Sequence, residues 1–203
     1  MKNVLVINTS LNNEQGNSNK LTELFVQQWQ QRENIALTQR NLSTLNLPHL
    51  SREEMQAWQT PLDDRSPRQE ELAAHSDQLI AELKTADSIV LGMPMYNFGV
   101  PSTFKAWIDR VARAGITFSY TDQGPKGLLE GKKVYILAAR GGIYAGTAKD
   151  SQSQYLKDFF AFLGMTQVEF IYAEGLAMGE ENAAKAWRTA QQKMAEILPP
   201  IAA

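Results

Sequence analysis

Short apolar segments alternate with helix-patterned segments along almost the whole chain. Strands are predicted at 4–7, 35–41, 87–93, 134–139 and 167–173. Between them, apolar residues recur at helical spacing, as Leu21, Leu24 and Phe25 do after the first strand. Parallel strands need crossover helices of this kind. The sequence therefore predicts an α/β fold, a three-layer sandwich in which a parallel sheet of about five strands carries helices on both faces.

The segments between the strands predict five helices and one ribbon. The helices are expected at 18–32, about 72–84, 101–115, around 156–163 and 180–197. Pro101 and Gly115 stand at the two ends of the third helix, where these residue types are favoured. Ile116, Phe118 and Tyr120 alternate with hydroxyl residues, which predicts an extended ribbon with one apolar face. A turn is expected at 122–125.

A chain of 203 residues is expected to form one domain, 1–203. Residues 43–68 do not fit the alternating pattern, because they show no clear period and contain Pro48, Pro61 and Pro67. A structureless excursion of this length in a compact domain is usually a functional lid, unless the assignment of elements there is wrong.

The composition excludes several kinds of chemistry. The sequence contains no cysteine and two histidines, His49 and His75. Disulfides, thiol nucleophiles and iron–sulfur clusters are therefore excluded, and no metal site is expected. Lys and Arg number 20 against 22 Asp and Glu, which argues against nucleic acid or an anionic membrane as a partner. An enzyme of this composition would depend on a bound cofactor for its difficult chemistry.

The first apolar segment, at 4–7, is too short for the core of a signal peptide. No apolar stretch approaches the ~18 residues that span a bilayer. We therefore expect a cytoplasmic protein without a membrane partner.

The loop after the first strand, 8–19, leads into a helix N-terminus. Ligands of such sheets bind at the carboxyl ends of the strands, where the strand order reverses. Ser10, Asn17 and Ser18 offer hydroxyl and amide donors there, and Gly16 permits close approach of the backbone. The loop is thus a candidate phosphate cradle without positive side chains. On its local sequence alone, the loop is better explained by a helix cap at Asn17 or Ser18 than by a phosphate site.

The loop after the third strand carries Met95, Tyr96, Asn97 and Phe98 between two prolines. An apolar, fairly rigid ledge of this kind suits a flat aromatic ligand. Packing of the aromatic side chains on the neighbouring helix is an equally good interpretation.

The loop after the fourth strand carries Ala139, Arg140, Gly141 and Gly142. The two glycines let main-chain amides approach a ligand, and Arg140 would place positive charge near a ligand that becomes anionic. An ordinary turn with a solvated arginine is the alternative. The three loops together indicate a mononucleotide with a flat ring, which favours flavin mononucleotide (FMN) over NAD.

Four segments carry a resemblance to a known family. They are 94–98 (PMYNF), 111–121 (VARAGITFSYT), 140–143 (RGGI) and 173–175 (AEG). Nearly the whole chain resembles the bacterial FMN-dependent NADH-azoreductases, also described as NADH:quinone oxidoreductases. The resemblance implies a flavodoxin-like fold and a homodimer with two FMN sites at its interface. Residues 43–68 differ most from the family and are expected to shape the substrate entrance.

The resemblance also implies roles for individual residues. The FMN phosphate is expected at Ser10 and 16–18, the flavin ring at 95–98 and its pyrimidine edge at 139–142. Family members often have serine at the positions of Gly16 and Ala139, so this chain would lack one hydroxyl contact at each.

Tyr120 and Phe162 resemble the aromatic residues that close over the open face of the flavin and contact the substrate. For Phe162 a simpler interpretation competes, because a phenylalanine beside Phe159 and Phe160 on a helix is more often part of the core.

The implied reaction is ping-pong. Hydride passes from NADH to FMN and then to a quinone or an aromatic azo compound, whose azo bond is cleaved to two amines. No side chain is expected to act as a catalytic acid or base, because FMN carries the chemistry. Three alternatives stay open: an electron carrier of the flavodoxin type, a reductase that releases reduced flavin, and a flavodoxin-like domain that binds no flavin.

Overall fold

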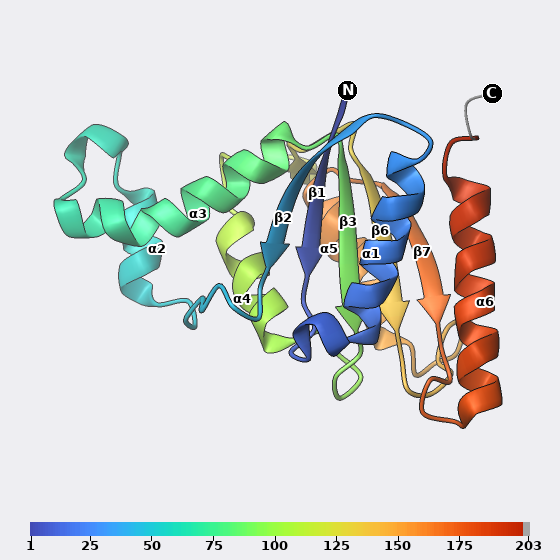
Figure 1. Cartoon of the computed structure of the whole chain (residues 1–203). Coiled ribbons are helices and arrows are strands. Elements are labelled where there is room, and N and C mark those ends of the chain that lie inside the picture. The colour runs from blue at the N-terminus through green and yellow to red at the C-terminus, as the bar shows by residue number, and fades with distance from the viewer. Residues whose placement is uncertain (201–203) are drawn as a thin grey trace.

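Five parallel strands form the centre of the computed structural model, which describes residues 1–200 (Figure 1). They are β1 (Lys2–Asn8), β2 (Ile35–Asn41), β3 (Ser88–Pro94), β6 (Lys133–Ala139) and β7 (Gln167–Ala173). Their order across the sheet is β2-β1-β3-β6-β7, and every neighbouring pair is parallel. The predicted sheet is confirmed. The central strand, β3, is buried along its whole length, as its continuous apolar sequence indicates.

Helices cover both faces of the sheet. One face carries α1 (Asn17–Gln30) and α6 (Glu180–Ile197), and the other carries α3 (Pro67–Thr85), α4 (Ser102–Val111) and α5 (Ser151–Phe162) (Figure 1). Each face buries its own apolar cluster, one around Phe25 and Trp29 of α1 and one around Trp107 and Phe160. The predicted three-layer α/β sandwich is therefore confirmed.

The expectation that residues 43–68 lack structure is wrong. They contain α2 (Arg52–Gln59), the short 3-10 helix η2 (Leu62–Asp64) and the start of α3. Ser51 caps α2 by accepting a hydrogen bond from Glu54 N at 3.1 Å. Such a Ser-x-x-Glu pattern is a helix-start signal, which the surrounding prolines obscured. In Figure 1, α2 and the first part of α3 project beyond β2.

The end of α4 also differs from the prediction. The helix ends at Val111 and not at Gly115. The reason is Thr117, whose buried hydroxyl donates to Val111 O at 2.6 Å and accepts from Arg113 N at 2.9 Å. This side chain closes the helix and draws the following residues into a tight turn.

The predicted ribbon is a hairpin of β4 (Phe118–Thr121) and β5 (Gly124–Gly127) outside the main sheet. Its extent was predicted wrongly. Ile116 precedes the first strand, and Gly124 and Pro125, which were assigned to the turn, lie in the second. The rings of Phe118 and Tyr120 lie 5.4 Å apart between centres, but Phe118 is buried and Tyr120 is 74% exposed.

Candidate functional site

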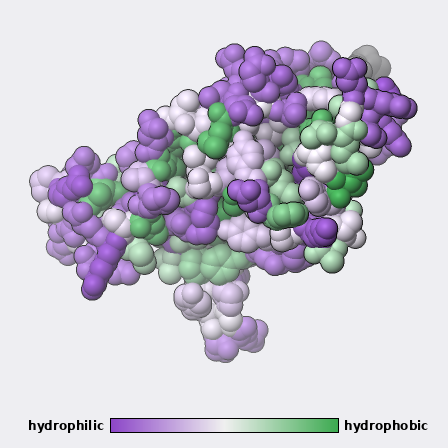
Figure 2. All heavy atoms as spheres, turned by 90° about the horizontal axis from the view of Figure 1, so that it is seen from below, coloured by the Kyte–Doolittle hydropathy of each residue, from purple (hydrophilic) through white to green (hydrophobic). Residues whose placement is uncertain are grey.

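Two adjoining pockets lie where the three predicted loops meet. The chain leaves β1 for the edge strand β2 and returns to β3 on the other side, so the strand order reverses between β1 and β3. The pockets enclose about 220 Å³ and about 230 Å³ and share Met95 and Gly141. Figure 2, which views the molecule from below, shows apolar and polar residues interspersed over this end.

Every residue that the sequence assigned to FMN lines one of these pockets. The first is lined by Ser10, Asn12, Gly16, Asn17, Ser18, Pro94, Met95, Tyr96, Ala139, Arg140, Gly141, Leu176 and Ala177. The second is lined by Met95, Asn97, Phe98, Gly141, Gly142 and Tyr144. Sequence reasoning missed Leu176 and Ala177, although they directly follow the segment 173–175 that carries part of the family resemblance.

The loop from β1 to α1 forms an uncapped helix start. The N-cap is Gly16, and within residues 1–200 no side chain caps the first turn. The alternative that Asn17 or Ser18 caps the helix is therefore wrong. The Ser18 hydroxyl contacts Asn19 Oδ1 at 3.5 Å instead. An uncapped helix N-terminus presents main-chain N–H groups and the positive end of the helix dipole, and it suits a phosphate group.

The first turn of α1 lies directly against β3. A Cβ on Gly92 would be 3.0 Å from Thr22 Cγ2 and 3.1 Å from Ser18 O. Thr9 Oγ1 donates to Gly92 O at 2.7 Å, and Thr22 Oγ1 donates to Asn8 Oδ1 at 2.7 Å. A glycine at position 92 therefore lets the helix start approach the sheet at the carboxyl end of β1.

A tight turn at 96–99, here called the ledge turn, separates the two pockets. Tyr96 N donates to Gly99 O at 3.1 Å, and Gly99 N donates to Tyr96 O at 2.9 Å. The two central residues, Asn97 and Phe98, have φ of 50° and 63°. Glycine is favoured at the second of these positions, and a phenylalanine there costs about 1–3 kcal/mol of backbone strain.

The aromatic side chains of this loop face the pockets. Tyr96 OH accepts from Leu11 N at 3.2 Å and contacts Ser10 Oγ at 3.4 Å. The Phe98 ring is 52% exposed and meets Tyr144 edge-on at 5.5 Å between ring centres. The structure therefore favours the ledge interpretation over packing of these rings on the neighbouring helix.

Gly141 and Gly142, here called the glycine rim, form the opposite wall. Their carbonyl oxygens accept from Ala177 N at 3.0 Å and Gly175 N at 2.9 Å. Within residues 1–200 their own N–H groups make no hydrogen bond. The rim can therefore offer main-chain donors to a ligand.

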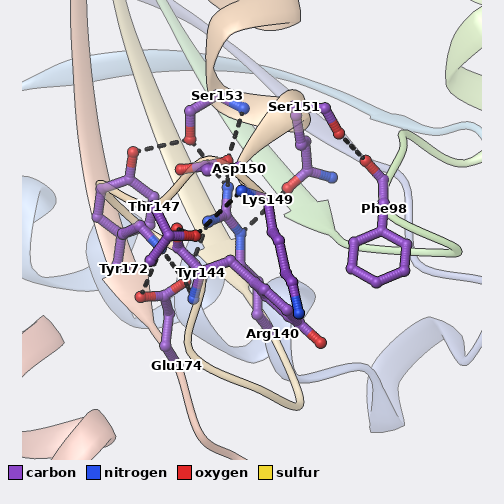
Figure 3. Close-up of polar contacts among 12 residues, drawn as sticks. Phe98, Arg140, Tyr144, Thr147, Lys149, Asp150, Ser151, Ser153, Tyr172 and Glu174 are labelled. Carbon is purple, nitrogen blue, oxygen red and sulfur yellow. Dashed lines mark hydrogen bonds and ion pairs between the residues drawn. The ribbon is translucent and has the colours of Figure 1, made fainter.

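The Arg140 side chain does not provide the free positive charge expected from the sequence. It is fully buried, and it pairs with Asp150 Oδ1 at 2.9 Å and Glu174 Oε1 at 3.0 Å (Figure 3). It also donates to Ser153 Oγ at 2.9 Å. Two carboxylates neutralise the guanidinium, because a buried charge must be paired. The alternative of a solvated arginine is equally wrong.

The same network fixes the loop that follows the glycine rim. Glu174 Oε1 accepts from Tyr144 N and Ala145 N, both at 3.0 Å (Figure 3). Burial raises the pKa of Asp150, but the hydrogen bonds from Arg140 and Ser153 outweigh it and hold the pKa of this carboxyl below its usual value. Asp150 is therefore ionised at neutral pH, and the hydrogen bonds of this network hold the backbone from 140 to 150 in place.

Tyr120 and Phe162 line neither pocket. Both rings belong to one aromatic cluster, in which Phe118 lies 5.4 Å from Tyr120 and 4.3 Å from Phe162 between ring centres. Phe162 is half-buried against the apolar core, as its place on the helix indicates. No residue from 43 to 68 lines either pocket, so the expected role of this segment at the substrate entrance stays a prediction.

Residues 1–200 contain no group of three acidic or histidine side chains that could hold a metal ion. None of their helices has the length and apolar character needed to cross a membrane. The cytoplasmic location stays a prediction.

The chain matches a known protein family over almost its whole length. Residues 2–198 match a family model described as a flavodoxin-like fold. The chain belongs to this flavodoxin-like family. The match covers almost the whole chain, including all three loops at the site, and confirms the fold that the sequence resemblance implies.

Individual relatives within the family cover nearly the same length. The chain is 59% identical to an FMN-dependent NADH:quinone oxidoreductase of Pseudoalteromonas atlantica over 98% of both chains. It is 49% identical to a protein of the same description from Alteromonas mediterranea, over 97% of this chain and 98% of the other. The crystal structure of an azoreductase from Bacillus anthracis superposes with a TM-score of 0.87 at 27% identity and covers 97% of this chain and 98% of that one. The predicted resemblance is confirmed.

Proposed function

We propose that the protein is an FMN-dependent oxidoreductase that transfers hydride from NADH through bound FMN to quinones and aromatic azo compounds. One observation carries the proposal: the uncapped start of α1 at Gly16 lines the same pocket as Tyr96 and Gly141. Relatives at 49% and 59% identity over nearly the whole chain are FMN-dependent NADH:quinone oxidoreductases, which supports the same activity here.

The residues present fit FMN. The first turn of α1 suits the phosphate, because no side chain within residues 1–200 competes for its N–H groups. Met95 and Tyr96 offer apolar surface for a flat ring on one side, and the glycine rim offers N–H donors on the other that no group within residues 1–200 engages. FMN in this position would accept hydride from NADH and pass it to the second substrate.

The residues of this chain would bind FMN and orient its ring. The loop from Ser10 to Ser18 would hold the phosphate without a positive side chain, so affinity depends on aligned main-chain dipoles. The N–H groups of Gly141 and Gly142 would stabilise negative charge at the ring edge that they face. Protons can come from solvent, and no side chain is assigned as a catalytic acid or base.

We further propose that the protein forms a homodimer and that Tyr120 and Phe162 complete the substrate site in it. Tyr120 is 74% exposed on the hairpin, which is unusual for a large aromatic side chain. Phe98 and Ile143, on the loops beside the pockets, are also more than half exposed. In a dimer these side chains would be buried against the second copy, which would explain why they are exposed in the single chain. Light scattering of the purified protein tests the dimer, for which twice the mass of 22.7 kDa is expected.

Steady-state oxidation of NADH with menadione as acceptor tests the reaction. The proposal predicts direct turnover at a rate that added free FMN does not change once the protein is loaded. A flavodoxin-type carrier would hold FMN but would not oxidise NADH. A reductase that releases reduced flavin would turn over faster with each addition of free FMN. Either result would contradict the proposal.

A further inference from the structure

The first turn of α5 is bonded to the loop that carries the ledge turn. Ser151 Oγ donates to Phe98 O at 2.7 Å (Figure 3). Gln152 Nε2 donates to Pro94 O and to Gly99 O, both at 2.9 Å. Pro94 and Gly99 lie before and after the two left-handed residues of the turn, Asn97 and Phe98. Side chains of α5 therefore hold a strained segment that borders both pockets.

The oxygen of the same Gln152 amide reaches the opposite wall. Its Oε1 accepts from Arg140 Nε at 3.3 Å, and Arg140 directly precedes the glycine rim. Gln152 is 1% exposed, and its bonds to Arg140 and Pro94 O are buried, where an unpaired polar group is costly. Gln152 itself lines neither pocket. It therefore acts on the site through the backbone of the two walls.

We propose that Gln152 is a positioning residue that fixes the ledge turn relative to the glycine rim and thereby sets the rate at which bound FMN is reduced by NADH. This inference rests on the proposed function. The candidate phosphate cradle belongs to a different loop, 8–19, whereas the side-chain hydrogen bonds of Gln152 go to Pro94, Gly99 and Arg140. Loss of the Gln152 amide should therefore change the reduction rate much more than the affinity for FMN, because hydride transfer is sensitive to small displacements of the reacting groups.

The hydrogen bonds of the Gln152 amide to Arg140, Pro94 O and Gly99 O form a bridge between the two walls. Two substitutions remove different bonds of this bridge. Gln152→Met has nearly the same length and removes every hydrogen bond of the amide. Gln152→Glu still accepts from Arg140 but has no N–H donor for Pro94 O and Gly99 O. Gln154→Glu is the matched control, since it makes the same chemical change on an exposed face of the same helix.

Three quantities are measured on wild type and variants: the Kd for FMN, the rate of FMN reduction by NADH in an anaerobic stopped-flow instrument, and hydrogen exchange of peptide 94–101 in the FMN-free protein. For both Gln152 variants we expect a Kd within about threefold of wild type and reduction slowed by about tenfold or more. Exchange in peptide 94–101 should be faster. Gln154→Glu should match wild type in all three quantities.

Other outcomes overturn the inference. Wild-type rates and exchange in both Gln152 variants would show that the bridge positions nothing. A rate that falls only in proportion to lost FMN or lost fold would show a general structural role. Slow reduction in Gln152→Glu alone would assign the effect to the added charge. If wild-type protein binds FMN but NADH does not reduce it, the proposed function fails, and this inference fails with it.

Discussion

Gly16 and Ser10 are packed against each other at the phosphate cradle, so that a Cβ at position 16 would lie 2.2 Å from Ser10 Oγ and 2.6 Å from Ser10 Cβ. The backbone at Gly16 has φ of −68° and ψ of 127°, which any residue can adopt. The glycine is therefore required by the close approach of Ser10 and not by backbone conformation. It also leaves the helix start without a capping side chain.

Gly16→Ala should weaken FMN binding, because the new methyl group displaces the Ser10 hydroxyl from its place in the cradle. Fluorescence titration with FMN should give a Kd about tenfold higher than that of wild type, equivalent to about 1.4 kcal/mol of binding free energy. In a Ser10→Gly background the same substitution should have a much smaller effect, because the two sites are in contact. Equal effects in both backgrounds would show that this contact does not matter.

Glu54→Gln should destabilise the protein strongly. Glu54 Oε2 pairs with Arg110 Nη2 at 2.7 Å, and their side chains are 5% and 1% exposed. Loss of one partner from a buried pair leaves an uncompensated charge and costs about 3–5 kcal/mol, or roughly 10 °C in Tm for a chain of this size.

Glu53→Gln is the matched control for this measurement, since Glu53 lies on the same helix but is 61% exposed and 3.6 Å from Arg68 Nε. It should change stability by less than about 0.5 kcal/mol. Similar melting temperatures for the two variants would mean that the Glu54 pair does not hold α2 to α4.

Gly127→Ala should detach the hairpin from the end of α5. A Cβ on Gly127 would lie 2.0 Å from Gly164 N and 2.2 Å from Leu163 C, and backbone atoms cannot move aside as a side chain can. We expect a loss of about 2 kcal/mol or more in urea unfolding. Lys126→Ala changes the neighbouring exposed residue and should be nearly neutral; equal losses would contradict the packing argument.

Asp150→Asn should show a stability difference that depends on pH. The pKa of Asp150 is lowered in the folded protein, so its contribution is present above the unfolded pKa of about 4 and is lost as the pH falls through the lower folded value. At pH 7 the variant should be less stable by about 1–3 kcal/mol.

Urea unfolding of the FMN-free protein at several pH values measures this difference. The gap between wild type and Asp150→Asn should narrow below about pH 4. Asp158→Asn, on the exposed face of the helix α5 that Asp150 caps, should show almost no gap at any pH. A gap for Asp150→Asn that stays constant into acid would contradict the assigned role of the carboxylate.

The strands and the site loops could be predicted because their signals are local. The strand 167–173 and the helix 180–197 have the predicted boundaries. Parallel order then brings the loops after the first, third and fourth predicted strands to one edge of the sheet. Features such as the glycines at 16 and 141 are visible in the sequence itself, and every residue assigned to FMN lines one of the two pockets; their contact with FMN stays a prediction.

The errors concern interactions between distant segments. Arg140 is neutralised by Glu174, which is 34 positions away, and no periodicity reveals that pairing. Thr117 closes α4 with a buried hydroxyl, whereas the alternating pattern assigned this residue to the ribbon. The exposure of Tyr120 likewise depends on where the hairpin packs.

The most direct test of the account is a visible absorption spectrum of the purified protein before and after anaerobic addition of NADH. We expect flavin bands in the protein as purified or after reconstitution with FMN, and bleaching of those bands within the mixing time. Bands that persist until dithionite is added would contradict it and would indicate an electron carrier supplied by another protein. A colourless protein that FMN cannot reconstitute would contradict the FMN site itself.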